Sequence, residues 1–305
     1  MKPTKIQVKS PATTANLGPG FDCLGMALDI WNIVYMNVCD RPIISIVGEG
    51  EDELQKNESN LVYRSAKSLL KALGEERINL HIQCHNNIPL KRGLGSSSAA
   101  IVAGVVGANY LVDNRMGQEE LLSLATSLEG HPDNVAPALL GGIQIAIDSV
   151  DGITTSPVPI PKDLTAVLFI PEFSIDTGLA RSVLSQTVPR IDAVYNVARV
   201  ALLVNALATG RLQDLKVGTE DRLHQPIRQV LYPAMDVIIR AAIDGGALGA
   251  FLSGSGPTIL ALTSGKEMTV GYEMAEAARK ANVAGTIKVT SPVAHGANAI
   301  QRLHG

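Results

Sequence analysis

The stretch that most constrains this chain is rich in glycine and serine: residues 89–100, which read PLKRGLGSSSAA. It follows a segment of alternating apolar residues, 78–84, and leads into an almost wholly apolar one, 99–112. The alternation predicts a strand, and the apolar run predicts a buried helix. Because Gly93 and Gly95 have no Cβ, the backbone there can turn sharply and bring its N–H groups close to an anion.

The serines of this stretch fall where the predicted helix begins. A helix N-terminus offers unpaired N–H donors and the positive end of the helix dipole, and Ser96, Ser97 and Ser98 add hydroxyls that can cap the turn or bind Mg²⁺. Such a site suits a nucleoside triphosphate, and the alternative is a plain turn followed by an N-cap. The stretch matches neither the Walker loop nor the three-glycine dinucleotide fingerprint.

Length, charge and cysteine content narrow the class of protein. A chain of 305 residues is long enough for two domains. The formal net charge is −3 and there is no basic run, so we expect a small polar substrate, no nucleic acid and no membrane. The longest apolar run, 99–108, is too short to span a bilayer, and residues 1–5 lead into a strand pattern rather than a signal sequence. Cys23, Cys39 and Cys84 lack C-x-x-C spacing, which favours free thiols in the cytoplasm.

Two further segments concentrate polar groups in the first half. Residues 10–22, SPATTANLGPGFD, predict a long loop in which Asn16 and Asp22 face a ligand or form local Asx turns. Residues 129–137, EGHPDNVAP, follow a predicted helix over 118–128. A carboxylate at a helix C-terminus opposes the dipole, so Glu129 either binds a ligand or is an exposed side chain beside a turn, and His131 can cap that turn.

Proline density rises at residues 157–161, where we place a domain boundary. Arg181 is predicted near the start of a helix, where it opposes the dipole. A negatively charged ligand accounts for it there, as does a surface salt bridge. Residues 253–258, SGSGPT, form a glycine turn between two apolar segments, which predicts either a hairpin or a backbone approach to a ligand.

The remaining periodicities predict the other elements. Strands are expected over 5–9, 30–38, 43–47, 143–147, 164–170, 248–252, 259–262 and 286–290, those before residue 60 forming an antiparallel sheet, and helices over 60–73, 193–208, 232–244 and 266–281.

Three of these segments, 11–22, 89–100 and 253–258, occur in an order that resembles the GHMP kinases, a family of small-molecule kinases, over nearly the whole chain. The resemblance implies an α+β fold of two domains: an N-terminal α/β domain with the ATP loop, residues 1–157, and a C-terminal ferredoxin-like domain, residues 158–305. Within the family, residues 11–22 and 131–137 resemble the members that phosphorylate L-homoserine. The implied reaction transfers the γ-phosphoryl group of ATP to that hydroxyl, a step of threonine biosynthesis. The resemblance also implies that the protein uses ATP and Mg²⁺ and that it forms a homodimer.

The resemblance also implies roles for individual residues. Those expected to bind ATP are Asn60, Val62, Pro89, Leu90, Lys91, Arg92, Gly93, Leu94, Gly95, Ser96, Ser97, Ser98 and Ala99. Ser97 and Glu129 are expected to hold Mg²⁺. Those expected to surround the amino acid are Asn16, Asp22, His131, Arg181 and Arg228. This division agrees with chemistry, because an α-carboxylate is best bound by arginine and an α-ammonium by a carboxylate such as Asp22.

The expected catalytic residues are Glu129, Asn134 and Asp133. Phosphoryl transfer depends on positioning and charge neutralisation, so Asn134 is expected to orient the substrate or the phosphate. Whether Asp133 accepts the proton of the hydroxyl or no base is used stays open. The alternatives to this function are a mevalonate- or sugar-type kinase of the same family, a catalytically silent binding protein on this fold, and an unrelated nucleotide-binding oxidoreductase.

Overall fold

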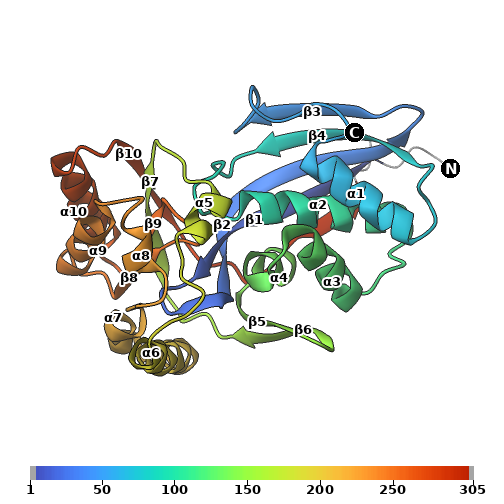
Figure 1. The fold of residues 1–305 in the computed structure, drawn as a ribbon. Coiled ribbons are helices and arrows are strands. Elements are labelled where there is room, and N and C mark those ends of the chain that lie inside the picture. Colours follow the sequence, from blue (N-terminus) through green and yellow to red (C-terminus); the bar gives the residue numbers. More distant parts are fainter. Residues whose placement is uncertain (1–4, 302–305) are drawn as a thin grey trace.

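Two sheets organise the residues that the computed structural model describes, 5–301 (Figure 1). The first has seven strands in the order β11-β1-β2-β4-β3, with β5 paired to β2 and β6 to β5. Its strands are β1 (Ile6–Asn16), β2 (Gly20–Cys39), β3 (Ile43–Gly48), β4 (Asn79–Asn86), β5 (Ile143–Ser149), β6 (Gly152–Val158) and β11 (Asn298–Gln301).

Two expectations about this sheet were wrong. The segment 10–22 is not a long loop: β1 and β2 run through it, and residues 17–19 turn between them. Strand β3, expected in an antiparallel sheet with the other strands before residue 60, pairs with none of them; it pairs with β4, in parallel. The physical reason is that α1 (Leu61–Ala72) lies between the two strands in the chain, and a helical crossover returns the chain in the same direction.

Helices α1, α2 (Ser96–Leu111), α3 (Gln118–Glu129) and α4 (Pro132–Leu140) pack together on one face of this sheet (Figure 1). As expected from its composition, α2 is buried along most of its length. Helix α4 was not expected, because its two prolines suggest a turn. Pro132 occupies the first turn, where its missing N–H leaves no hydrogen bond unmade.

The second sheet is antiparallel throughout, in the order β10-β7-β9-β8. Its strands are β7 (Thr165–Pro171), β8 (Gly249–Leu252), β9 (Ile259–Thr263) and β10 (Gly285–Thr290). Its helices are α5 (Thr177–Ser182), α6 (Arg190–Thr209), the short turn η1 (Leu212–Asp214), α7 (Leu215–Gly218), α8 (Gln225–Arg228), α9 (Met235–Asp244) and α10 (Glu267–Lys280). Sheet order and helix placement give the β-α-β-β-α-β arrangement of a ferredoxin-like unit.

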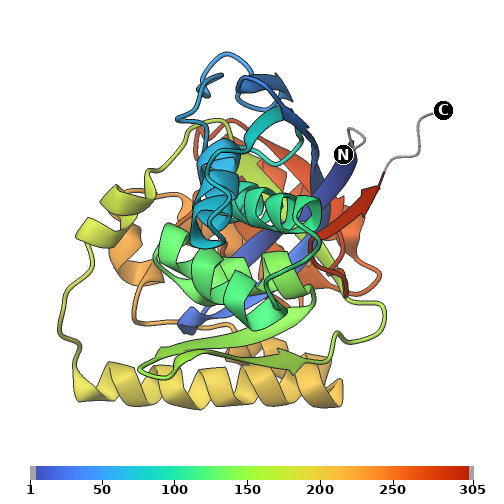
Figure 2. The same ribbon diagram turned by 90° about the vertical axis from the view of Figure 1, so that its right-hand side faces the viewer.

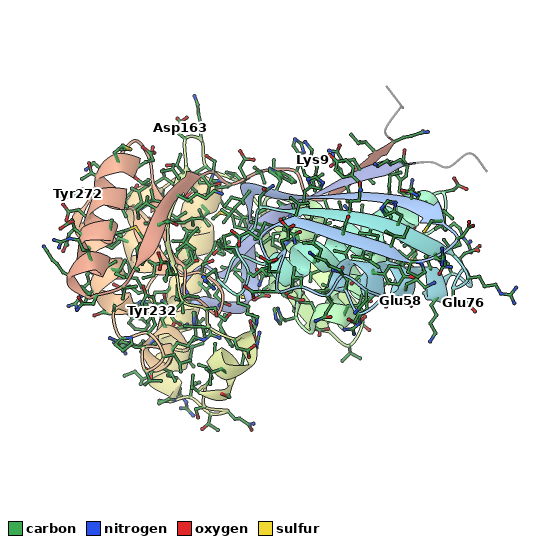
Figure 3. All side chains as sticks on the ribbon, turned by 90° about the horizontal axis from the view of Figure 1, so that it is seen from above. Lys9, Glu58, Glu76, Asp163, Tyr232 and Tyr272 are labelled. Atoms are coloured by element: carbon green, nitrogen blue, oxygen red, sulfur yellow. The ribbon has the colours of Figure 1, made fainter. Side chains whose placement is uncertain are left out.

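A shared hydrophobic core joins the two halves. Leu17 and Leu28 of the first half lie in one buried cluster with Leu168, Phe251 and Leu260 of the second. The view from above shows the halves side by side, with Tyr232 and Tyr272 in one and Glu58 and Glu76 at the far end of the other (Figure 3). Strand β11 returns the end of the described chain to the first sheet, where it pairs with β1.

Helix α6 is the one element in the described part of the chain whose length and apolar composition would allow it to cross a membrane. This criterion is weak for a single helix, because core helices meet it too. Here α6 lies along one edge of the protein below β5 and β6 and packs against α7 (Figure 2).

Candidate active site

A cavity of about 490 Å³ lies where the glycine-rich stretch, the N-terminus of α1 and the end of α3 meet residues of the second half. Most of the predicted site residues line it: Asn16, Asp22, Asn60, Val62, Leu90, Lys91, Arg92, Gly93, Leu94, Gly95, Ser96, Ser97, Glu129, His131, Asp133, Asn134, Arg181 and Arg228. Pro89, Ser98 and Ala99 are not among the lining residues.

The glycine-rich stretch has the backbone that its sequence predicts. Gly93 and Gly95 have φ angles of 71° and 65°, which residues with a Cβ rarely adopt. Gly95 is the N-cap of α2 and supplies no side-chain capping bond. The N–H groups of the first helical turn are therefore not capped by a side chain, and the positive end of the helix dipole lies at the cavity.

The second half of the chain braces this loop. The hydroxyl of Ser253 donates to the carbonyl oxygen of Gly93 at 2.6 Å, and the N–H of Thr258 donates to that of Arg92 at 3.3 Å. A Cβ on Gly93 would lie 2.2 Å from the carbonyl oxygen of Ser253, so the approach of the two turns requires glycine. The turn over 253–258 is thus a hairpin that supports the loop.

The side chain of Arg92 also supports the glycine-rich loop. Its Nε atom donates to the carbonyl oxygen of Pro171 at 2.8 Å, and its Nη2 atom donates to that of Glu172, both at the end of β7. Although Arg92 lines the cavity, its guanidinium joins the glycine-rich loop to the second sheet.

Asn60 and Val62 lie at the start of α1. The Asn60 side chain is the N-cap, and its Oδ1 atom accepts the N–H groups of Val62 at 3.0 Å and Tyr63 at 3.4 Å. Leu54, Leu61 and Leu90 line the same part of the cavity. The cavity wall here combines these apolar side chains with the capped N-terminus of α1 and with the polar residues Gln55 and Ser59.

Glu129 is the last residue of α3, as the sequence predicts. Its Oε1 atom accepts hydrogen bonds from the hydroxyls of Ser97 at 2.5 Å and Ser98 at 2.7 Å. These serines therefore direct their hydroxyls at a carboxylate instead of capping α2. A carboxylate beside two hydroxyls is a set of hard oxygen donors of the kind that Mg²⁺ prefers.

His131, Asp133 and Asn134 form one hydrogen-bonded group at the start of α4. The Oδ1 atom of Asp133 lies 2.6 Å from Nδ1 of His131 and accepts the N–H of Asn134 at 2.8 Å. This hydrogen bond raises the pKa of His131, although burial opposes the shift. The Asn134 side chain accepts the hydroxyl of Thr13 at 2.7 Å. The group is thereby fixed to β1.

The side chain of Asn16 forms hydrogen bonds with two backbone groups. Its Nδ2 atom donates to the carbonyl oxygen of Gly254 at 3.0 Å, and its Oδ1 atom accepts the N–H of Asp22 at 3.1 Å. Asn16 and Asp22 have φ angles of 70° and 57°, a left-handed conformation that asparagine and aspartate tolerate better than most residues. The side chain thus shapes the β1–β2 turn at the edge of the cavity.

Arg181 and Asp22 form a two-point ion pair, with distances of 3.0 and 2.7 Å between nitrogen and oxygen. The position expected for Arg181 was wrong: it lies near the end of the six-residue helix α5, where a cation is favoured by the dipole. The helix begins earlier than expected, at Thr177 after its N-cap Asp176, and already ends at Ser182. Arg228, in α8, is buried close by.

Sequence reasoning missed two residues that shape this site: Thr13 orients Asn134, and His224 contacts Arg228. The turn over 253–258 was expected as a hairpin or a backbone approach, and its Gly254 carbonyl oxygen accepts from both Asn16 and Arg228. The only signal for His224 is its position one helical turn before an arginine, which is too common a pattern to select it.

Comparison with known proteins identifies the family to which this chain belongs. The chain matches the N-terminal domain of the GHMP kinases over residues 60–142 and the C-terminal domain over 203–282. It is 43% identical over 290 residues to a homoserine kinase of Moorella thermoacetica, covering 95% of this chain and 98% of that one. The chain belongs to the homoserine kinase family of GHMP kinases. As a member of that family it is an ATP-dependent kinase, which excludes the oxidoreductase alternative.

Solved structures agree with this family. The crystal structure of homoserine kinase from Cytophaga hutchinsonii superposes with a TM-score of 0.89 at 33% identity, covering 98% of both chains. The structure of L. major mevalonate kinase in complex with R-mevalonate has a TM-score of 0.69 at 15% identity, covering 93% of this chain and 95% of that one, a likeness of fold alone. The two-domain GHMP fold expected from the sequence is confirmed.

Proposed function

We propose that this kinase transfers the γ-phosphoryl group of ATP to the side-chain hydroxyl of L-homoserine, giving O-phospho-L-homoserine for threonine biosynthesis. The identity of the acceptor is inferred from the arrangement of charged residues at one end of the cavity. Arg181 and Arg228 approach the same region as Asp22, and Arg228 makes no ion pair with any described residue. Such a pattern suits an α-amino acid, whose carboxylate binds arginine and whose ammonium binds aspartate.

The other end of the cavity is assigned to ATP. We propose that the N–H groups of Gly93 to Ser98 and the N-terminus of α2 bind the phosphates, since this turn lacks a side-chain cap. Asn60, Val62 and the apolar residues beside them would receive the adenine. Residues 89–92 and Ala99 would shape the loop. The bracing by Ser253 and Arg92 supports this assignment, because a phosphate site acts best when its donors are held in place.

Glu129 and Ser97 are assigned to Mg²⁺. The described residues contain no cluster of three histidine, cysteine or acidic side chains. That fits Mg²⁺, which is usually held by one or two carboxylates together with substrate phosphates. When bound, Mg²⁺ neutralises charge on the triphosphate. Ser98, whose hydroxyl reaches the same oxygen of Glu129, holds the carboxylate in position.

The group at the start of α4 is assigned to orientation of the acceptor. We assign Asn134 to the acceptor or the phosphate and His131 to the amino acid, since both line the cavity. The Oδ1 atom of Asp133 already accepts from His131 and Asn134. We therefore assign Asp133 to holding these two side chains through Oδ1. Asn16 contributes by fixing the turn that carries Asp22.

The test of this function is ADP release by the purified protein with ATP, Mg²⁺ and one acceptor at a time: L-homoserine, mevalonate, galactose or none. Release that depends on L-homoserine supports the proposal. Release with mevalonate or galactose would instead identify another kinase of the family, and no release with any acceptor would indicate a catalytically silent protein.

The quaternary structure and location proposed from the sequence are a homodimer in the cytoplasm. The support for a dimer is the outer face of α6, the helix that lies along one edge of the protein (Figure 2). Every exposed position between residues 191 and 208 is uncharged. Ile191, Val194 and Val197 are 70%, 62% and 66% exposed. Two copies of this face would meet without burying a charge. Sedimentation equilibrium should give a dimer that Val194→Glu dissociates, and a monomeric wild type would contradict it. The three free cysteines suit the reducing cytoplasm.

For the domains, we propose the division 1–157 and 158–305. Its support is that β6 ends at Val158 and β7, the first strand of the second sheet, begins at Thr165. In the second range, β11, Val158 at the end of β6, and Pro292, which bridges to Leu28, pair with the first sheet.

A further inference from the structure

Arg228 is a cation that the protein buries without a direct negative partner among the described residues. It is 3% exposed. Its Nε atom donates to the carbonyl oxygen of Ala180 at 3.1 Å, and its Nη1 atom donates to that of Gly254 at 2.9 Å. Burial, together with the nearby Arg181, lowers the pKa of Arg228 to about 10. The guanidinium is thus still charged at neutral pH, and it lines the cavity.

The third partner of Arg228 is a histidine ring. Nη1 of Arg228 lies 3.1 Å from Nδ1 of His224, which is fully buried. A guanidinium has only donors, so Nδ1 of His224 must be the acceptor and carries no proton. The other ring nitrogen, Nε2, lies 2.8 Å from the carbonyl oxygen of Gly18 and must therefore carry the proton and donate. Its two partners fix the neutral tautomer of His224 from both sides.

A nearby carboxylate does not change this assignment. Asp221 lies 3.6 Å from Nε2 of His224, farther than the carbonyl oxygen of Gly18. The Asp221 carboxylate already accepts the backbone N–H groups of residues 223, 224 and 225 and the side-chain amide of Asn196. Its charge is therefore satisfied by N–H donors, and burial lowers the pKa of His224.

The neighbouring ring reinforces the arrangement. Phe21 stacks on His224 with ring centroids 5.3 Å apart, and the guanidinium of Arg228 lies 5.6 Å from the Phe21 centroid. Asn196 donates to the carbonyl oxygen of Pro19, next to Gly18. The β1–β2 turn and the arginine are therefore held by one buried histidine, through opposite edges of its ring.

We propose that His224 is a positioning residue for acceptor recognition: its Nδ1 atom holds the Arg228 guanidinium in the orientation that binds the carboxylate of the acceptor, while donation from Nε2 to Gly18 fixes the tautomer in which Nδ1 can accept. The proposal rests on the proposed function, since it needs an acceptor with a carboxylate. It assigns to His224 a role in the affinity for the acceptor and none in the binding of ATP, whose site is at the other end of the cavity.

Two substitutions separate the two edges of the ring. In His224→Asn the amide oxygen can take the place of Nδ1 and accept from Arg228, while the donor to Gly18 is lost. In His224→Gln the amide nitrogen can reach the position of Nε2 and donate to Gly18, while the acceptor for Arg228 is lost. The exposed His85 provides a matched control as His85→Gln.

The readouts are kcat and the KM values for acceptor and ATP, with circular dichroism as a check of folding. His224→Gln should raise the acceptor KM roughly tenfold, since a hydrogen bond to a charged group is lost. Its ATP KM should stay unchanged and its kcat should fall much less than the KM rises. His224→Asn and His85→Gln should keep an acceptor KM close to that of wild type.

The proposal is overturned if His224→Gln leaves the acceptor KM unchanged, because the contact with Arg228 would then not affect acceptor binding. It is also overturned if His224→Asn raises this KM as much as His224→Gln does, because loss of the Gly18 contact would then matter as much as loss of the Arg228 contact. If His224→Gln does not fold, His224→Asn is compared with Arg228→Gln. An acceptor KM of His224→Asn close to that of wild type supports the proposal. An acceptor KM of His224→Asn as high as that of Arg228→Gln overturns it.

The same experiment separates this proposal from the proposed function. If the wild-type protein phosphorylates mevalonate instead of L-homoserine, the function is wrong but the acceptor still has a carboxylate, and the variants are measured with mevalonate. If the acceptor is galactose, which has no carboxylate, the role of His224 is overturned as well.

Discussion

The guanidinium of Arg181 in α5 and the carboxylate of Asp22 in β2 bond to each other at two points, although they lie 159 residues apart. Both side chains are only about one-third exposed, so the pair joins the two halves of the protein at the rim of the cavity. Each member also has the charge that the opposite end of an amino acid needs. The ion pair thus holds both groups in place before the acceptor arrives.

Lysine in place of either arginine tests this end of the cavity. Arg181→Lys and Arg228→Lys should each raise the KM for L-homoserine roughly tenfold, because lysine cannot make two parallel hydrogen bonds to a carboxylate. The ATP KM should stay constant. The exposed Arg240, which pairs with Asp236, serves as the control in Arg240→Lys. If neither site variant changes the homoserine KM, the carboxylate binds elsewhere.

Glu129→Gln tests the assignment of the metal. The amide keeps the shape of the side chain but loses the negative charge, so kcat should fall about 100-fold and the Mg²⁺ concentration for half-maximal rate should rise. The exposed Glu119 at the start of α3 is the control in Glu119→Gln. Undiminished turnover of Glu129→Gln at low Mg²⁺ would rule out this role.

Two glycine variants test the phosphate loop. Gly95 and Gly74 both have positive φ angles, 65° and 76°, but only at Gly95 would an added Cβ collide with another atom, Oγ1 of Thr13 at 1.8 Å. Gly74→Ala should cost about 1 kcal/mol of unfolding free energy and leave the ATP KM unchanged. Gly95→Ala should cost more and also raise the ATP KM. Equal ATP KM values in both variants would mean that the loop does not bind the phosphates.

The His131–Asp133 contact predicts a pH-dependent stability. Because the hydrogen bond to Asp133 raises the pKa of His131 in the folded state above its ordinary value of 6.5, the stabilisation is fully present below 6.5 and is lost as pH rises through the raised pKa. Urea unfolding should therefore show a larger difference between wild type and His131→Asn below pH 6.5 than well above it. A difference that stays constant with pH would show that protonation of His131 does not stabilise the fold.

Much of this fold could be read from the sequence where one local signal dominates. The apolar run of α2 and the glycines before it predicted a buried helix behind a sharp turn, and both are present. The alternating and periodic segments likewise predicted most of the helices and strands of the second half. Glu129 was correctly expected at a helix C-terminus beside the serines.

The features that were missed depend on contacts between distant segments. Residues 10–22 look like a loop because of their prolines and glycines, yet pairing with neighbouring strands extends β1 and β2 through them. Strand β11 exists because β1 offers an edge to pair with. The role of His224 depends on Gly18, which is 206 residues away, and no local pattern encodes that separation.

The most direct test of the account is the identity of the phosphorylated product. The wild-type protein is incubated with ATP, Mg²⁺ and an equimolar mixture of L-homoserine, mevalonate and galactose, and the products are identified by mass spectrometry and ³¹P NMR. The account predicts O-phospho-L-homoserine as the dominant product, formed in step with ADP. Phosphomevalonate or a sugar phosphate as the dominant product would contradict it.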